Sequence, residues 1–169
     1  MLIVRGTGRN VGKTLSACNI IKQLAEKHNP VGVKISPHFH SLDGIQDCIH
    51  KSEKLIIVEE KNISGKDSSR MLQAGAKKVF YIQAKNDQLP EAINLLSVHL
   101  NPYEPVVVES GGLYDYIEPS LLITIIGNKN GKEINIRNST NALNLPSAKV
   151  HEFMWNSIQF KNRKITFHA

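Results

Sequence analysis

The sequence predicts a three-layer α/β fold, in which a mostly parallel β-sheet is covered by helices on both faces. Three observations lead to this prediction. Apolar runs of strand length alternate with helical segments along most of the 169 residues. Two of these runs, 105–109 and 121–126, are rich in β-branched residues, as is typical of central strands. The first run, Leu2–Arg5, passes through a glycine-rich turn directly into a helix.

The elements are expected in a strand-helix order that continues to about residue 126. The segments expected as strands are 2–5, 31–35, 55–58, 79–82, 105–109 and 121–126. The 55–58 run is interpreted as half of a hairpin that ends at 62–65. Alternation with period two at 158–167 predicts a C-terminal β-hairpin, interpreted as an edge that closes the sheet.

Three helices are expected between these strands. The first leaves the glycine-rich turn and carries an apolar stripe at Ala17, Ile20, Ile21, Leu24 and Ala25. The second is predicted to be capped by Asp67 or Ser68 and closed by Gly75. The third is an amphipathic helix from about Leu89 to Leu100.

Length and composition favour one cytoplasmic domain over residues 1–169. A chain of this size buries roughly two thirds of its unfolded surface without disulfides. Its only cysteines, Cys18 and Cys48, are too few for a secreted framework, which favours a reducing compartment. No apolar stretch approaches membrane-span length, and Met1 leads directly into a strand instead of a cleavable signal. We therefore expect no membrane association.

The net charge of +6 is concentrated near the end of the chain. Residues 127–169 contain seven Lys or Arg against Glu133 and Glu152. A basic segment can bind nucleic acid, but this one lacks the interleaved aromatic residues that single-strand binders use. A basic balance also suits polyphosphate ligands, so nucleic-acid binding is not expected.

The segment Gly6-Thr7-Gly8-Arg9-Asn10-Val11-Gly12-Lys13-Thr14 is interpreted as a phosphate-binding loop of the Walker A kind. Glycines let backbone N–H groups turn toward an anion, and the first turn of the helix adds unpaired donors. Lys13 is expected to reach the terminal phosphates and Thr14 to hold Mg²⁺. The usual pattern has glycine where Thr7 stands, so the turn is one residue longer. The predicted nucleotide-binding residues are Gly8, Arg9, Asn10, Val11, Gly12, Lys13, Thr14, Leu15 and Asn128.

Other polar residues follow the ends of the predicted strands. Because parallel strands point their carboxyl ends to one rim, we expect Lys34 and Glu109 beside the phosphate loop. Triphosphate chemistry needs cations on the phosphates and carboxylates that organise magnesium. The predicted metal ligands are therefore Thr14, Asp67 and Glu109, and the predicted catalytic residues are Lys13, Lys34, Asp67 and Glu109. Helix capping is the alternative role of Asp67.

A second kind of site is weighed in the loop after the second predicted strand. Potential zinc ligands occur within thirteen positions, at His38, His40, Asp43, Asp47, Cys48 and His50. No paired Cys-x-x-Cys is present, which makes this pattern a weak metal signal. The favoured interpretation is a loop covering the phosphate side, with His38 or His40 touching the ligand.

With these residues in view, the chain resembles P-loop NTPases of the group that includes molybdopterin-guanine dinucleotide biosynthesis protein B and dethiobiotin synthetase. The order of features over roughly residues 1–127 resembles the first of these families. Val31-Gly32-Val33-Lys34, followed by His38 and His40, is similar to its lysine and histidine loop.

The segment Gly65-Lys66-Asp67-Ser68, running into Ala74-Gly75-Ala76, is similar to the next block of the same family and is the more specific match. The phosphate loop, with Val11-Gly12-Lys13-Thr14 after a lengthened turn, is instead similar to that of dethiobiotin synthetase. The sequence thus combines features of both families.

The resemblance implies a P-loop fold and a shared set of roles. It makes Lys13 the phosphate lysine, Thr14 a magnesium ligand, Asp67 and Glu109 acidic partners of that metal, and Lys34 a substrate-side or phosphate-side cation. It also implies a homodimer, and Arg9 would act within its own chain or toward the partner subunit. The first family implies GTP binding, weak hydrolysis and a molybdopterin nucleotidyltransferase partner. The second implies an ATP-dependent ligase.

Two departures from these families affect the expectation. Ser110-Gly111-Gly112 follows Glu109, where the first family usually has glycine directly after the glutamate. Asn128-Lys129-Asn130 stands where a guanine-reading Asn-Lys-x-Asp is expected, but the fourth position is Gly131. We therefore expect a magnesium-dependent slow NTPase that favours GTP over ATP. A nucleotide-gated adaptor without an enzymatic product is the third alternative.

Overall fold

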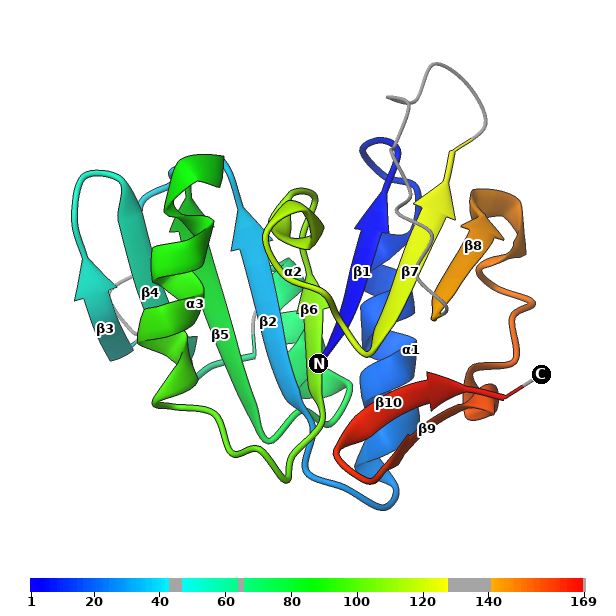
Figure 1. The fold of residues 1–169 in the computed structure, drawn as a ribbon. Helices are drawn as coiled ribbons and strands as arrows, with labels where there is room; N and C mark the ends of the chain where they lie inside the picture. Colours follow the sequence, from blue (N-terminus) through cyan, green and yellow to red (C-terminus); the bar gives the residue numbers. More distant parts are fainter. Residues whose placement is uncertain (43–46, 64–65, 128–140, 169) are drawn as a thin grey trace.

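The structure is a computed structural model that describes residues 1–42, 47–63, 66–127 and 141–168. In this part of the chain, eight strands form one sheet in the order β3-β4-β5-β2-β6-β1-β7-β8 (Figure 1). The strands are β1 (Leu2–Gly6), β2 (Val31–Ser36), β3 (Asp47–Lys51), β4 (Leu55–Glu60), β5 (Lys78–Ala84), β6 (Val106–Glu109), β7 (Leu121–Ile126) and β8 (Ala142–Pro146). All neighbours from β5 to β8 are parallel, whereas β3 and β4 are antiparallel additions. The predicted α/β class with a mostly parallel sheet is confirmed.

Helices lie on both faces of this sheet (Figure 1). The α-helices are α1 (Lys13–Ala25), α2 (Asp67–Gln73) and α3 (Leu89–Ser97). Short 3₁₀ turns are η1 (Asn86–Gln88), η2 (Leu113–Asp115), η3 (Ser147–Lys149) and η4 (Trp155–Ser157). Helices α1 and α2 share one face, and α3 covers the other. Among the described residues, no helix has the length and apolar character needed to cross a membrane.

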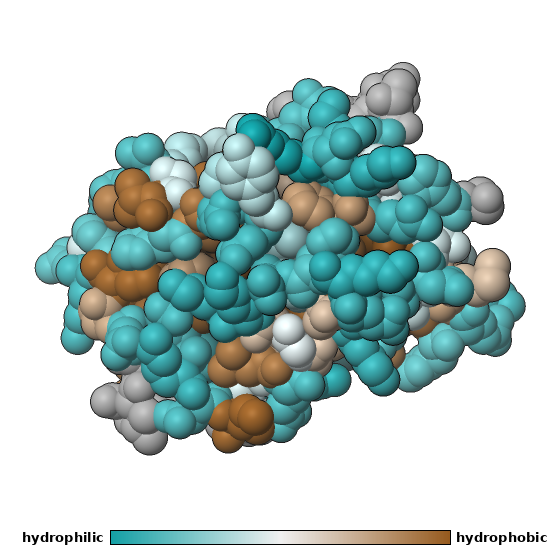
Figure 2. Space-filling view, turned by 90° about the horizontal axis from the view of Figure 1, so that it is seen from below, coloured by the Kyte–Doolittle hydropathy of each residue, from teal (hydrophilic) through white to brown (hydrophobic). Residues whose placement is uncertain are grey.

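The alternation of side chains along the strands divides the core into two halves. On β1, Leu2 and Val4 pack with the α1 stripe, while Ile3 packs with α3. The residues of the predicted α1 stripe that are fully buried are Ala17, Ile20, Ile21 and Leu24. The parallel strands point their carboxyl ends upward in Figure 1, toward the loop after β1. The opposite end, seen from below, is mostly hydrophilic with separate hydrophobic patches (Figure 2).

Two helix boundaries differ from the prediction. The N-cap residue of α2 is Lys66, and no side chain caps the helix, so the predicted capping by Asp67 or Ser68 is wrong. The Ser68 hydroxyl instead donates to Glu60 (2.7 Å). Gly75 does follow the helix in the left-handed region (φ 101°), as predicted. Helix α3 ends at Ser97 instead of at Leu100. The N–H groups of His99 and Leu100 bond to carbonyls only three residues back, so these residues form turns and do not extend the helix.

The edge strands and hairpins of the fold were only partly foreseen. Strand β4 does belong to a hairpin, but its partner is β3, which precedes it in the chain. The predicted end of the hairpin at 62–65 is therefore wrong: residues 62–63 are outside any strand, and residues 64–65 lie outside the described residues. Neither β3 nor the edge strand β8 was predicted to be a strand. Both are partly exposed strands without a long apolar run. The C-terminal hairpin is confirmed as β9 (Ile158–Lys161) and β10 (Lys164–Phe167).

The C-terminal hairpin does not close the main sheet, so that part of the interpretation is wrong. It forms a separate two-stranded sheet beside α1 (Figure 1). Its inward residues Ile158 and Ile165 are buried in the same cluster as the α1 stripe. The turn residues Asn162 (φ 52°) and Arg163 (φ 60°) have the positive φ values of a tight hairpin turn. The hairpin is therefore held by the packing of its apolar face against α1, and not by hydrogen bonds to an edge strand of the main sheet.

Candidate functional site

The sheet order brings the predicted site residues to one rim. Strand β6 lies between β1 and β2, although it is far from both in sequence. In the register of these parallel strands, Glu109 is paired with Val4 on one side and with Lys34 on the other. The last residue of β6 therefore lies between the strand that enters the glycine-rich loop and the strand that carries Lys34.

The loop between β1 and α1 is anchored at its start by two hydrogen bonds of Thr7. The Thr7 N–H donates to the Ile125 carbonyl (3.0 Å), and the Gly127 N–H donates to the Thr7 hydroxyl (2.9 Å). These bonds attach the loop to the end of β7. Thr7, which replaces the usual first glycine of the motif, thus contributes a hydroxyl anchor that the pattern does not reveal.

The interior of the loop is packed around the Val11 side chain. A Cβ on Gly6 would lie 2.6 Å from Val11 Cγ2, and one on Gly127 would lie 2.8 Å from Val11 Cγ1. A real Cβ does not approach that closely, so glycine is needed at both positions for the turn to close over Val11. This contact explains how a lengthened turn remains compact.

A segment from the end of the chain supports the loop from outside. The Ser147 hydroxyl donates to the Val11 carbonyl (2.8 Å), and the buried Val150 side chain lies beside Gly12. Sequence analysis missed both residues, because nothing in their local pattern indicates a contact across more than a hundred positions. The region after β7 therefore helps to shape the candidate phosphate loop.

Replacing Gly12 with alanine should destabilise the fold by about 1–3 kcal/mol, because φ of Gly12 is 104° and side-chain-bearing residues are strained there. The new Cβ would also lie 3.3 Å from Val150 Cγ2. Urea denaturation measures the effect. Gly111→Ala is the matched control, since its Cβ would meet nothing within 4 Å. Equal stability of the two variants would contradict a strained Gly12.

Four side chains from four elements form the polar centre of the site. Thr14 on α1 donates its hydroxyl proton to Glu109 Oε2 (2.9 Å). Lys34 donates to Glu109 Oε1, and its Nζ also lies 3.6 Å from Asp67 Oδ2 at the start of α2. Glu109 is only 2% exposed, so water contributes little to stabilising its negative charge, and these hydrogen-bond partners must stabilise it instead. The structure brings together Thr14, Lys34, Asp67 and Glu109, as the sequence predicted.

Lys13 completes this arrangement from the first position of α1. Its Nζ folds back to donate to the Gly8 carbonyl (2.5 Å). Burial lowers the pKa of the Lys13 ammonium, an effect that nearby Glu109 partly opposes. Because the ammonium is partly desolvated, an anion that binds beside it stabilises its charge more than it would stabilise a fully hydrated ammonium. The position therefore suits the binding of a phosphate at the start of the helix.

The donor set of this site fits magnesium together with a nucleotide. Mg²⁺ binds oxygen ligands and usually takes one or two carboxylates, with phosphates and water completing the coordination. Thr14, Glu109 and Asp67 provide a hydroxyl and two carboxylates. In the described parts of the chain, no group of three or more His, Cys, Asp or Glu residues is placed to hold a metal ion. A metal here would therefore depend on oxygens supplied by the ligand.

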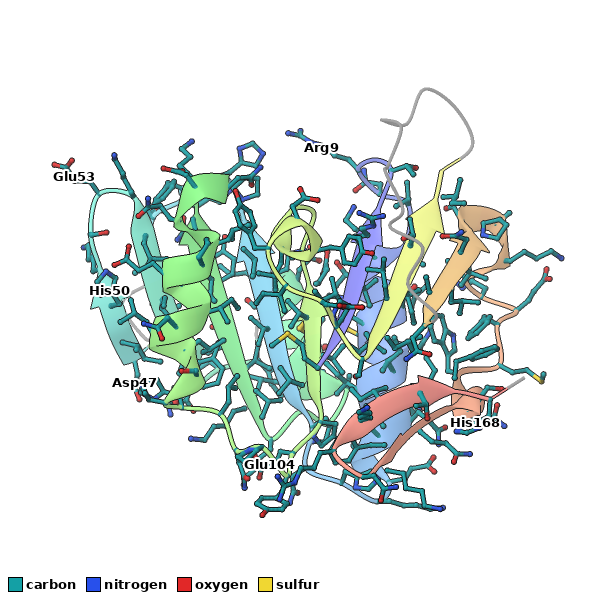
Figure 3. All side chains as sticks on the ribbon, in the orientation of Figure 1. Arg9, Asp47, His50, Glu53, Glu104 and His168 are labelled. Atoms are coloured by element: carbon teal, nitrogen blue, oxygen red, sulfur yellow. The ribbon has the colours of Figure 1, made fainter. Side chains whose placement is uncertain are left out.

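The remaining predicted nucleotide-binding residues occupy different parts of the loop. Arg9 is exposed and projects from the loop at the top of the molecule (Figure 3), with one guanidinium nitrogen 3.4 Å from His38 Nε2. Asn10 adopts a left-handed conformation (φ 56°). Leu15 packs partly against the α1 core. Asn128 lies outside the described residues.

The loop after β2 is held over the same rim by a residue that sequence analysis missed. The side chain of Gln83, at the end of β5, is 0% exposed. Its amide donates to the His40 carbonyl (3.1 Å) and its carbonyl accepts the His40 N–H. The single signal in the sequence was a glutamine within an apolar strand, which must satisfy its amide when buried.

The remaining potential zinc ligands are far from this loop. Asp47, Cys48 and His50 belong to β3, and the labelled Asp47 and His50 lie at the far edge of the sheet from Arg9 (Figure 3). Asp43 lies outside the described residues. The hairpin places these side chains on an exposed edge strand and separates them from His38 and His40. The described residues thus give the zinc alternative no support.

Cys18 lies one turn after Thr14 on α1 and is partly shielded from solvent. Burial raises the pKa of its thiol to about 11. At pH 8 only about one molecule in a thousand then carries the reactive thiolate. We expect iodoacetamide at pH 8 to modify the exposed Cys48 first, with labelling of Cys18 rising steeply as the pH approaches 11. Peptide mass spectrometry would report the order, and equal labelling of both at pH 8 would disprove it.

Comparisons with known proteins do not identify a relative of this chain. No protein-family model matches the sequence, and neither a curated protein nor a solved structure matches the chain. The inference about function therefore rests on the residues and on their arrangement in this fold.

Proposed function

We propose that this chain is a magnesium-dependent P-loop nucleotide-binding protein with slow nucleoside triphosphatase activity. The observation that carries the proposal is the hydrogen bond from Thr14 to Glu109. It joins the residue after the loop lysine to a buried carboxylate at the end of the neighbouring strand. A hydroxyl and a carboxylate so placed, beside Lys13, form a metal-phosphate site.

The residues of the site have separate roles in this proposal. The loop N–H groups and the start of α1 bind the phosphates, and Lys13 leaves the Gly8 carbonyl for the terminal phosphates. Thr14, with Glu109 and Asp67, would hold the metal, which would supply positive charge beside the phosphates. Lys34 exchanges part of its contact with Glu109 for the ligand. Because Glu109 already serves Thr14 and Lys34, it is poorly placed to activate water, which favours slow hydrolysis.

The finer parts of the proposal rest on sequence resemblance. The preference for GTP over ATP rests on Asn128-Lys129-Asn130, outside the described residues. Assistance in molybdenum cofactor maturation, beside a molybdopterin nucleotidyltransferase, follows from the order of motifs over residues 1–127. The cytoplasmic location is inferred from composition. A homodimer belongs to the same proposal, with Arg9 near the nucleotide of its own or the partner subunit.

Isothermal titration with GTP and ATP, each with and without Mg²⁺, tests the proposal directly. We expect both nucleotides to bind when Mg²⁺ is present, GTP more tightly, and the affinity to fall at least about tenfold without the metal. Inorganic phosphate release over hours would then report the slow hydrolysis.

Each deviation from this pattern has a distinct meaning. Negligible, metal-independent binding of both nucleotides would overturn the phosphate site altogether. A clear preference for ATP would favour the ligase alternative over the GTP-binding one. Tight binding without any release of phosphate would favour an adaptor whose bound state is the output.

A further inference from the structure

The peptide bond between Val11 and Gly12 lies where the phosphate loop enters α1. The carbonyl of Gly12 already belongs to the helix, because it accepts the Ser16 N–H and the Ser16 hydroxyl, both at 2.9 Å. The N–H of Gly12 is not fixed by those bonds, since rotation about the N–Cα bond of Gly12 separates it from the helix. Within the described residues, this N–H donates no hydrogen bond. Its direction must therefore be set from outside the helix.

Glycine at position 12 makes the orientation of this peptide plane easy to change. Its φ is 104°, and a residue without a Cβ exchanges positive and negative φ values at little cost. The hydrogen bond from the Ser147 hydroxyl to the Val11 carbonyl (2.8 Å) restrains the plane. A trans peptide is planar, so its carbonyl and its N–H point in opposite directions. Holding the Val11 carbonyl toward Ser147 therefore directs the Gly12 N–H away from Ser147.

The order of the strands decides what lies in that direction. Ser147 follows β8, which lies beyond β7 on one side of β1, whereas Glu109 ends β6 on the other side (Figure 1). The two residues thus approach the loop from opposite sides. Thr14 is bonded to Glu109. An N–H that points away from Ser147 is therefore directed to the side of the candidate metal and phosphate site.

Ser147 is itself held in place from both directions along the chain. Before it, β8 pairs with β7 as far as Pro146, which lies opposite Ile126 and has φ fixed by its ring. After it, the Val150 N–H donates to the Ser147 carbonyl (3.3 Å), and the Val150 side chain is buried in the core cluster around α1. The hydroxyl is thus presented by an anchored turn. It must be the donor, because a carbonyl can only accept.

We propose that Ser147 is a positioning residue of the phosphate loop, whose hydroxyl holds the Val11–Gly12 peptide with its N–H directed at the bound phosphates. The inference rests on the proposed function and adds the C-terminal part of the chain to it. No side chain caps α1 in the described residues, so the N–H groups of Gly12, Lys13 and Thr14 form one set of donors for an anion. Without Ser147 the peptide can turn over, which replaces one donor of this set with a carbonyl oxygen.

The test compares Ser147→Ala with the unmodified full chain by isothermal titration in Mg²⁺. The probes are a non-hydrolysable GTP analogue and tripolyphosphate, which offers phosphates without a base. We expect the variant to bind both ligands more weakly by the same factor, at least about tenfold, because a hydrogen bond to a charged group is lost. Ser147→Thr keeps the hydroxyl and should restore the affinity. The matched control Ser97→Ala removes another hydroxyl-to-carbonyl bond, to Asn94 (2.6 Å), and should leave the affinity unchanged.

An NMR titration of the ¹⁵N-labelled chain with Mg²⁺ and tripolyphosphate reads the position of the N–H itself. In the unmodified chain, the amide proton signals of Gly12, Lys13 and Thr14 should all move downfield, as expected for N–H groups that donate to an anion. In Ser147→Ala, the Gly12 signal should lose most of this shift, while Lys13 and Thr14 keep theirs. A role of Ser147 in stability alone would not single out Gly12.

The outcomes separate this inference from the proposed function. If the unmodified chain binds neither probe, the proposed function fails and this inference fails with it. If both probes bind, and Ser147→Ala binds them equally well, the positioning role alone is overturned. It is also overturned if Ser147→Thr loses as much affinity as Ser147→Ala, or if only the GTP analogue binds more weakly. Should Ser147→Ala not fold, the unmodified chain still decides, since a Gly12 signal that stays unmoved while Lys13 and Thr14 shift contradicts the proposal.

Discussion

Replacement of Lys13 with alanine should abolish magnesium-nucleotide binding while leaving the fold intact. The ammonium is partly desolvated and, within the described residues, donates to the Gly8 carbonyl, so its loss should change the free energy of unfolding by less than about 1 kcal/mol. Its contacts with the phosphates would be charge-assisted, at about 1.5–3 kcal/mol each. Two such bonds correspond to a loss of affinity of at least about a hundredfold, measurable by isothermal titration.

Lys22→Ala is the matched control for this variant. Lys22 lies on the same helix but is exposed, and its removal tests whether a general loss of positive charge weakens binding. The control should bind nucleotide as the unmodified chain does. Unchanged affinity in Lys13→Ala would count decisively against a phosphate-binding role for the loop, whatever its resemblance to known motifs.

Replacement of Glu109 with glutamine should weaken the effect of magnesium on nucleotide binding more than it weakens the metal-independent affinity for the nucleotide. Glutamine keeps the shape of the side chain and can still accept from Thr14, but it lacks the charge that a metal requires. We expect the Mg²⁺ concentration for half-maximal nucleotide binding to rise at least about tenfold, which corresponds to about 1.4 kcal/mol. Binding measured in EDTA should change by less than about threefold, or about 0.7 kcal/mol.

The change at Glu109 also alters the surroundings of Lys34. That ammonium would keep Asp67 at 3.6 Å as its remaining carboxylate, so the variant should fold with reduced stability. Glu91→Gln, on the exposed face of α3, is the matched control and should behave as the unmodified chain. A normal magnesium titration in Glu109→Gln would remove this carboxylate from the metal site.

Much of the fold could be predicted because its signals are local. The central strands are short runs of apolar, β-branched residues, and α1 and α3 carry apolar stripes that a single sequence reveals. The phosphate loop was also a local signal, since its glycines and the following Gly-Lys-Thr are contiguous. Edge strands such as β3 and β8 were missed because they are partly exposed and lack such a pattern.

The sequence by itself determined which residues are candidates for the chemistry: a lysine and threonine at a helix start, and acidic or basic residues after apolar strands. Only the tertiary structure decided how they meet. The insertion of β6 between β1 and β2 places Glu109 in register with Lys34, 75 residues away in the chain. Ser147 and Val150 support the phosphate loop, Gln83 holds the loop after β2, and Glu60 holds the start of α2. These contacts join segments far apart in sequence, and strand order and register, which depend on the packing of the whole sheet, bring them together.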